Sequence, residues 1–183
     1  MDKRGKKIRF FLHVKAMLFS FLLIGIVGCG YQFYARGEHI DPQIQKVFVK
    51  TFLNRTSEPY LETYIQNAFV DRFIRGNRFK IAESPEAADA ILRGNIKNFS
   101  TSPLAYGDND LVTEERINIT MEIIFEERDT KKVIWANKSF SKSEDCLLSE
   151  TSQSANQTSH KNAIAKLSND IAERAYQFIM SGF

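Results

Sequence analysis

The strict alternation of residues between Arg116 and Glu127 constrains the fold more than any other feature of this sequence. Alternate positions are apolar: Ile117, Ile119, Met121, Ile123 and Phe125. The positions between them include the polar residues Asn118, Thr120, Glu122 and Glu126. Because successive side chains of a strand point to opposite faces, this pattern predicts a strand with one buried and one solvated face, which is typical of antiparallel sheets.

The residues after this strand predict a hairpin. Residues 127–130 (ERDT) favour a turn, and Val133 to Ser141, with the single tryptophan Trp135, favours a returning strand. Upstream, we expect strands at 46–53, 79–82 and 90–99, with a loop at 100–110 that contains Pro103 and Gly107.

Two segments have the period of amphipathic helices. The first follows the turn at 54–57, where Thr56 or Ser57 can cap it, and runs to about Arg75 before Gly76 ends it. Its aromatic stripe is expected to be core rather than a ligand groove. The second covers about 160–180, after a polar stretch at 143–159 that is expected to be a loop or a frayed helix start.

These elements predict an α+β two-layer sandwich in the order β-α-β-β-β-β-α. Its sheet is mixed and mostly antiparallel, with four to five strands, and both amphipathic helices cover one face. The sequence shows no internal repeat and no low-complexity tract.

The N-terminus has a basic segment followed by a short apolar run, Ala16 to Val27. Twelve helical residues reach about 18 Å, short of the hydrocarbon core of roughly 30 Å, so the pattern indicates a signal peptide. An uncleaved anchor extended by residues 10–12 is the alternative. The run ends at Gly28-Cys29, which resembles the lipobox of bacterial lipoproteins, although a structural cysteine would read the same way.

The lipobox resemblance implies cleavage between Gly28 and Cys29. Cys29 would then carry an S-diacylglycerol and an N-acyl chain, which is enough lipid for permanent anchoring. Gly30 stands where an aspartate would favour the inner membrane, so the expected address is the periplasmic side of the outer membrane. The predicted domains are the signal peptide, 1–28, the lipidated tether, 29–44, and a single domain, 45–183.

Signal-peptide removal changes the charge. The whole chain has 25 basic and 22 acidic residues, and loss of 1–28 removes six and one, leaving 19 against 21. No basic excess remains to suggest nucleic acid. Cys146 becomes the remaining thiol; it can pair with a partner in an oxidising periplasm or be an ordinary unpaired residue.

Four stretches of the mature chain resemble the lipopolysaccharide-assembly lipoprotein (LptE-like) family: CGYQF, VFVKTFLNRTSEPYLETYIQNAF, EAADAILRGNIKNFSTSPLAY and INITMEIIFEERDTKKVIW. The resemblance implies a lipoprotein that complexes with, plugs and helps assemble the lipopolysaccharide-translocating (LptD-like) β-barrel. It also implies that the chain binds lipopolysaccharide during insertion into the outer leaflet, and that it needs no cofactor beyond the acyl chains on Cys29.

Phosphates on lipid A and its core sugars would pair with basic side chains. The candidates are Arg128, Lys131 and Lys132 around the hairpin turn, and Arg93 and Lys97 along a preceding strand. The alternative is that these charges only solvate the turn.

Catalytic motifs are missing from the sequence: there is no G-x-S-x-G, H-E-x-x-H, C-x-x-C or P-loop pattern. The mature chain has two histidines, His39 and His160, too few for a metal site by themselves. We therefore expect a binding and assembly protein. The alternatives are a periplasmic scaffold that activates cell-wall synthesis or another envelope complex, and a lipoprotein enzyme that acts through clustered carboxylates such as Glu126, Glu127 and Asp129.

Overall fold

The computed structural model describes residues 39–182. The predicted signal peptide, Gly28 and Cys29, and the tether up to residue 38 lie outside this range. The described residues form two α-helices, six strands and one short 3-10 helix. The helices are α2 (Leu61–Gly76) and α3 (Gln153–Ser181), and the 3-10 helix is Pro85–Ala87. The strands are β1 (Lys46–Val49), β2 (Leu53–Asn54), β3 (Lys80–Ile81), β4 (Ala90–Tyr106), β5 (Val112–Glu127) and β6 (Val133–Leu147).

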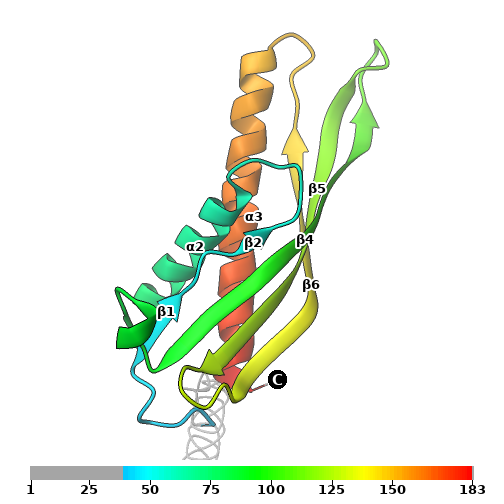
Figure 1. Ribbon diagram of the computed structural model, residues 1–183. Coiled ribbons are helices and arrows are strands. Elements are labelled where there is room, and N and C mark those ends of the chain that lie inside the picture. Colours follow the sequence, from blue (N-terminus) through cyan, green and yellow to red (C-terminus); the bar gives the residue numbers. More distant parts are fainter. Residues whose placement is uncertain (1–38, 183) are drawn as a thin grey trace, which may run out of the picture. The chain divides into compact units, whose positions relative to one another are not determined.

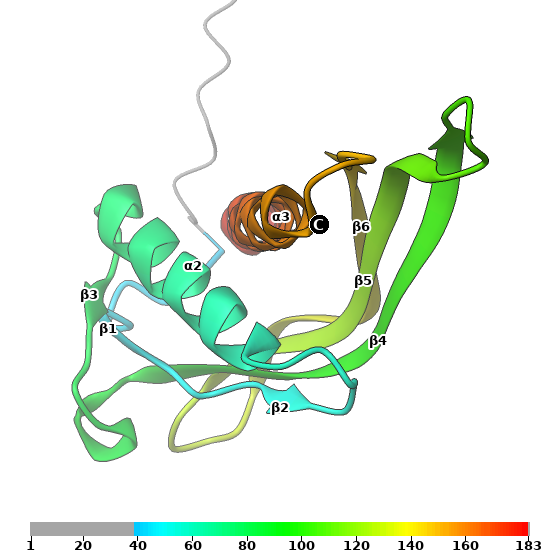
Figure 2. The same ribbon diagram turned by 90° about the horizontal axis from the view of Figure 1, so that it is seen from above.

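All six strands belong to one mixed sheet with the order β3-β1-β4-β5-β6, and β2 pairs with β4 beside β1. The pairs β1–β3, β1–β4 and β2–β4 are parallel, whereas β4–β5 and β5–β6 are antiparallel and much longer. Both helices lie on the concave face of the curved sheet (Figure 2). The predicted two-layer α+β sandwich is therefore confirmed, with six strands because the predicted strand at 46–53 is divided into β1 and β2.

The alternation in β5 has the predicted consequence. Its apolar side chains are fully buried under the helices, and they pack with Leu92 and Ile96 of β4 and with Leu167 and Ile171 of α3. Aromatic rings fill the base of the core, where Phe73 of α2 lies 5.2 Å from the ring of Tyr176 on α3 and 6.0 Å from that of Phe125. Burial of this face is the main stabilising contribution to the fold.

Three elements extend beyond their predicted limits. Residues 100–106 belong to β4, not to a loop, and β6 continues to Leu147. The last helix begins at Gln153, where the Ser152 hydroxyl accepts a hydrogen bond from the Ala155 amide. Together these extensions build a distal arm, defined here as residues 97–119 and 141–165, which stands above the base of the sheet (Figure 1).

The first helix begins later than predicted, at Leu61, and neither Thr56 nor Ser57 is its N-cap. Pro59 disfavours a helical conformation at Glu58, so the chain turns before the helix can start. Asn54 holds this turn: its side-chain amide donates to the Glu58 carbonyl at 2.9 Å and to a Glu62 carboxylate oxygen at 2.8 Å. Its side-chain oxygen accepts from the amide of Thr56 at 3.0 Å.

Candidate functional site

The outer face of the sheet, opposite the helices, carries two of the five predicted cations, Arg93 and Lys97. The Arg93 guanidinium makes two hydrogen bonds to the carboxylate of Glu126, at 3.0 and 2.8 Å. This contact lowers the pKa of Glu126 and raises the pKa of Arg93. Farther along β4, the Lys97 ammonium donates to the Lys138 carbonyl at 2.8 Å. The Arg93 charge is thus already matched within the domain.

The turn between β5 and β6 carries the other three predicted cations. Arg128 pairs with Asp129 at 2.7 Å and also donates to the Glu86 carbonyl. Lys132 lies 3.6 Å from Glu127. Lys131 has a left-handed backbone (φ 58°), and its ammonium makes no hydrogen bond or ion pair within residues 39–182. The structure therefore gathers Arg128, Lys131 and Lys132 at one turn but leaves only Lys131 unpaired there.

Between these cations, the outer face is a hydrogen-bonded polar surface. Asn95 donates to Glu122 at 2.9 Å, Thr120 donates to Ser141 at 3.1 Å, and Arg116 pairs with Asp145 at 2.7 Å. The predicted solvated face of β5 is confirmed. Cross-strand pairs of this kind contribute modestly to sheet stability and hold the register.

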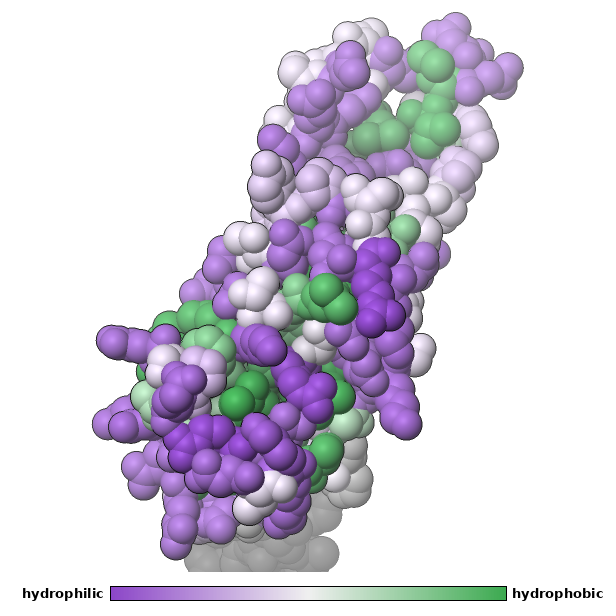
Figure 3. Space-filling model, viewed as in Figure 1, coloured by the Kyte–Doolittle hydropathy of each residue, from purple (hydrophilic) through white to green (hydrophobic). Residues whose placement is uncertain are grey.

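The tip of the distal arm is apolar instead. Four of the large exposed hydrophobic side chains of the described chain lie at the free ends of β4, β5 and β6: Leu104, Tyr106, Leu111 and Leu147. Figure 3 shows hydrophobic residues on the surface at this end, with hydrophilic residues around them. Tyr106 is 60% exposed and Leu147 is 71% exposed, so the arm ends in an exposed apolar surface.

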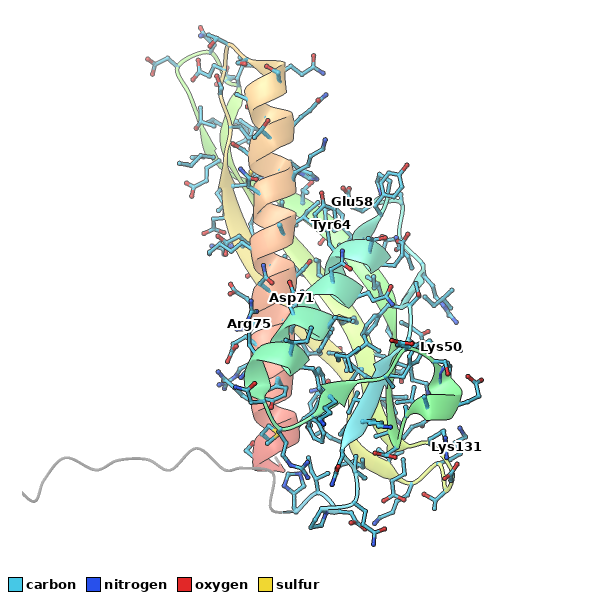
Figure 4. All side chains as sticks on the ribbon, turned by 90° about the vertical axis from the view of Figure 1, so that its left-hand side faces the viewer. Lys50, Glu58, Tyr64, Asp71, Arg75 and Lys131 are labelled. Atoms are coloured by element: carbon cyan, nitrogen blue, oxygen red, sulfur yellow. The ribbon has the colours of Figure 1, made fainter. Side chains whose placement is uncertain are left out.

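A groove separates the first turns of α2 from the N-terminal half of α3. The two helices touch at their later turns, where Arg72 pairs with Glu173 at 2.6 Å and lies over the Tyr176 ring. Toward the arm, a cavity of about 530 Å³ opens between them. We call it the α2–α3 groove; its lining includes Pro59, Tyr60, Thr63, Tyr64, Asn67 and Lys161. Figure 4 shows Glu58 and Tyr64 together at the start of α2, facing α3.

A second cavity of about 300 Å³ continues the groove toward β5, and Glu58 and Lys161 line both cavities. At the boundary, His160 of α3 lies between two carboxylates: Nε2 is 3.4 Å from Glu58 and Nδ1 is 3.3 Å from Glu115. The imidazole also contacts the Phe99 ring, at 6.0 Å between centroids. His160 thus joins the loop before α2, the helix α3 and the strand β5.

Neither this groove nor the cluster around His160 could be predicted from the sequence. Its residues come from the loop before α2, from α2, from β5 and from α3, and no short motif links them. The one local signal is Pro59-Tyr60, which places an exposed aromatic residue directly before a helix.

The remaining candidate residues show structural roles or lie outside the described range. Cys146 is buried, and burial raises the pKa of its thiol, which makes it a poor nucleophile and a poor disulfide partner in the folded arm. Within residues 39–182, no cluster of three or more His, Cys, Asp or Glu side chains can hold a metal ion. None of the helices in that range has the length and apolarity that crossing a membrane requires.

Comparisons with known proteins give a family and a fold. The model of the family described as LptE, lipopolysaccharide-assembly, matches residues 44–180. None of the curated proteins is a significant match to this sequence.

Two solved structures have the same fold. A Xanthomonas campestris protein is 9% identical, with a TM-score of 0.54 over 75% of this chain and 85% of its own. A Caulobacter crescentus protein described as a lipoprotein is 7% identical, with a TM-score of 0.53 over 72% of this chain and 88% of its own. Rare lipoprotein B of Shewanella oneidensis is 16% identical, with a TM-score of 0.49 over 75% and 95%.

Proposed function

This chain belongs to the lipopolysaccharide-assembly family, and on that premise we propose that it is an outer-membrane lipoprotein of lipopolysaccharide transport. It complexes with the lipopolysaccharide-translocating β-barrel, plugs it, helps to assemble it, and binds lipopolysaccharide during insertion into the outer leaflet. The family match over residues 44–180 carries this proposal. The family is one of lipoproteins that are not enzymes and that partner a barrel of this kind.

The polar outer face of the sheet supports the plug role. The lumen of a large outer-membrane barrel is polar and filled with water, so a plug needs a surface whose polar groups are already satisfied. The pairs Asn95–Glu122, Thr120–Ser141 and Arg116–Asp145 supply such a surface on strands β4 to β6.

The proposed anchor is Cys29, acylated after cleavage behind Gly28, with residues 29–44 as the tether and 45–183 as the functional domain. The first described residue, His39, lies beside the C-terminal end of α3: a Cβ on Gly182 would be 3.3 Å from its ring. This end of the domain is opposite the apolar tip of the arm (Figure 1). The tether therefore joins the domain at the end opposite the apolar tip.

Co-purification from outer membranes tests the proposal. The full-length chain carries a C-terminal tag, the membranes are solubilised in detergent, and copurifying proteins are identified and quantified. A large β-barrel at about one-to-one stoichiometry that withstands high salt is expected. Recovery alone, or with cell-wall synthases, would instead favour a periplasmic scaffold. As controls, Cys29→Ser is expected to leave the outer-membrane fraction, whereas Cys146→Ala, which changes the other cysteine, is expected to remain.

Lipopolysaccharide binding is proposed to use the five predicted cations, and Lys131 should contribute most because its ammonium makes no hydrogen bond or ion pair among the described residues, whereas the other four each make one. We expect Lys131→Ala to weaken lipopolysaccharide binding several-fold, and dephosphorylated lipopolysaccharide to bind wild type and variant alike. Lysine and alanine both carry a Cβ, so the left-handed backbone at φ 58° is equally strained in the wild type and the variant. Lys50→Ala, which removes a charge near the end of β1, is the matched control. Unchanged binding after joint replacement of Arg128, Lys131 and Lys132 would eliminate the turn as a contact.

A further inference from the structure

The α2–α3 groove offers polar groups that the described part of the chain does not use. The hydroxyls of Thr63 and Tyr64, the amide of Asn67 and the ammonium of Lys161 have no hydrogen-bond or ion-pair partner among residues 39–182. Asn67 follows Thr63 by four positions and Tyr64 by three, so these side chains lie on one side of α2 and line the cavity together with Lys161 of α3. Donors and acceptors therefore converge on a space of about 530 Å³.

Tyr60 at the rim of the groove is in a conformation that packing does not explain. Its backbone is left-handed (φ 62°, ψ 9°), which is unfavourable for a bulky side chain, and the residue is 72% exposed. An aromatic residue held in such a conformation without burial points to a role outside the core. The backbone itself is anchored, since the Tyr60 carbonyl accepts from the amides of Thr63 at 3.0 Å and Tyr64 at 3.2 Å. Tyr60 and Tyr64 thus line one groove from a fixed helix start.

This combination matches the chemistry of a sugar. A pyranose ring has apolar C–H faces that pack on aromatic rings, and an edge of hydroxyls that need both donors and acceptors. The volume of the groove lies in the range of small-molecule sites. A purely apolar ligand would bury the free amide and ammonium without partners, at an energetic cost. A phosphate-rich ligand would find a single unpaired cation, Lys161, among the groups that line the cavity.

We propose that the α2–α3 groove binds a short acidic oligosaccharide. Tyr60 and Tyr64 pack on sugar rings, Thr63 and Asn67 bind hydroxyls, and Lys161 pairs with one anionic substituent. The proposal rests on the lipopolysaccharide-assembly role for the source of the sugar, which would be the saccharide core of lipopolysaccharide. The glycan strands of peptidoglycan have the same chemistry and are tested separately.

The test uses the full-length lipidated chain in detergent and two soluble probes, so that no lipid tail contributes to binding. One probe is the core oligosaccharide released from lipopolysaccharide by mild acid, and the other is a muropeptide disaccharide from peptidoglycan. Binding is measured by isothermal titration calorimetry. Saturable binding of the core oligosaccharide is expected; binding of the muropeptide alone would keep the glycan site but change the source of the sugar. Binding of neither probe would overturn the proposal, while co-purification with the barrel would still test the assembly role independently.

Variants separate binding from folding. Tyr60→Asn removes the ring but suits the left-handed backbone, so thermal stability should be kept or raised while affinity falls about tenfold. Tyr106→Asn makes the same change at the exposed tip of the arm and should bind normally. Lys161→Gln should weaken binding of the acidic oligosaccharide but not of a neutral fragment of it. Full affinity in Tyr60→Asn and Lys161→Gln together would overturn the proposal.

Discussion

Glu126 shows how one residue can link charge to stability. It is 6% exposed, on the outer face of β5, and its carboxylate is matched by the Arg93 guanidinium. Removing one member of such a pair leaves a largely buried charge without a partner, which is more costly than removing both. The sequence predicted Arg93 only as a candidate partner for lipopolysaccharide phosphates, because its pairing with Glu126 connects residues 33 positions apart on neighbouring strands.

We predict that Arg93→Met lowers the free energy of unfolding by about 2 kcal/mol at neutral pH, allowing for solvent screening at the half-exposed Arg93. The hydrogen bond from Arg93 lowers the pKa of folded Glu126 below its usual 4.5. The pair therefore stabilises the fold fully above that value, and its contribution is lost as pH falls through the lowered pKa. Urea unfolding at several pH values measures this. Arg93→Met/Glu126→Leu is the control and should recover part of the loss; equal stability of the single variant and wild type at pH 7 would contradict the role.

Gly94 matters because the neighbouring strand leaves no space for a side chain at this position. A Cβ there would lie 2.1 Å from the Glu122 carbonyl oxygen and 2.9 Å from a ring carbon of Phe52. The first of these neighbours is backbone of β5 and cannot move away without disturbing the sheet.

Gly94→Ala is expected to destabilise the domain by about 3 kcal/mol through this overpacking. At Gly107 an added Cβ meets chiefly the Glu150 side chain, which can rotate away, so Gly107→Ala should change stability by less than about 0.5 kcal/mol. Thermal unfolding followed by circular dichroism compares the two. Similar melting temperatures for both variants would contradict the close approach at Gly94.

Among the elements, those of the base could be predicted from the sequence and those of the arm only in part. The apolar alternation of β5 and the helical period of α2 both reflect burial, and both elements are present as predicted, although α2 begins later, at Leu61. Residues 100–106 carry no such pattern because most of their side chains are exposed; they are a strand because β5 lies alongside to accept their hydrogen bonds. A strand that is held only by pairing with another strand has no hydrophobic periodicity of its own, so it cannot be predicted from its local sequence.

The same reasoning applies to the start of α3. Residues 153–159 are mostly polar and exposed, so their helical state depends on the cap at Ser152 and on Asn156, which bonds Ser149 through both its amide and its oxygen. A polar first turn of this kind is indistinguishable in sequence from a loop.

Ser152→Ala is predicted to destabilise the first turn of α3 by about 1 kcal/mol, because the Ala155 amide loses its partner. Hydrogen exchange at residues 153–156 should quicken, with little change in the core of the base. Ser159→Ala inside the same helix is the matched control and should stabilise slightly, since alanine is the better helix former. Uniformly faster exchange over the whole chain would show instead that the arm and base unfold as one unit.

At the scale of the whole molecule, the candidate surfaces are distributed by chemistry. The outer sheet face is polar and internally paired, the tip of the arm is apolar, and the α2–α3 groove keeps free polar groups beside aromatic rings. The amino-acid composition could not predict this separation of polar and apolar surfaces, because the same residues in another topology would bring polar and apolar side chains onto the same face. The groove in particular depends on α2 and α3 meeting at one end only, which is a property of the assembled fold.

The contact between α2 and α3 also dictates when the domain can finish folding. It joins residues near the beginning of the described chain to residues at its end, as in the pair Arg72–Glu173, so the core closes only around the final helix. Contacts so distant in sequence close slowly and cannot form while the last segment is still missing. A chain that is threaded across a membrane from its N-terminus would therefore remain without its core until its last thirty or so residues had emerged, a length set by α3 (29 residues). For a chain threaded in this way, commitment to the native state would come only at the end of the passage, and a chain cut short before α3 would present its apolar strand faces to chaperones and proteases.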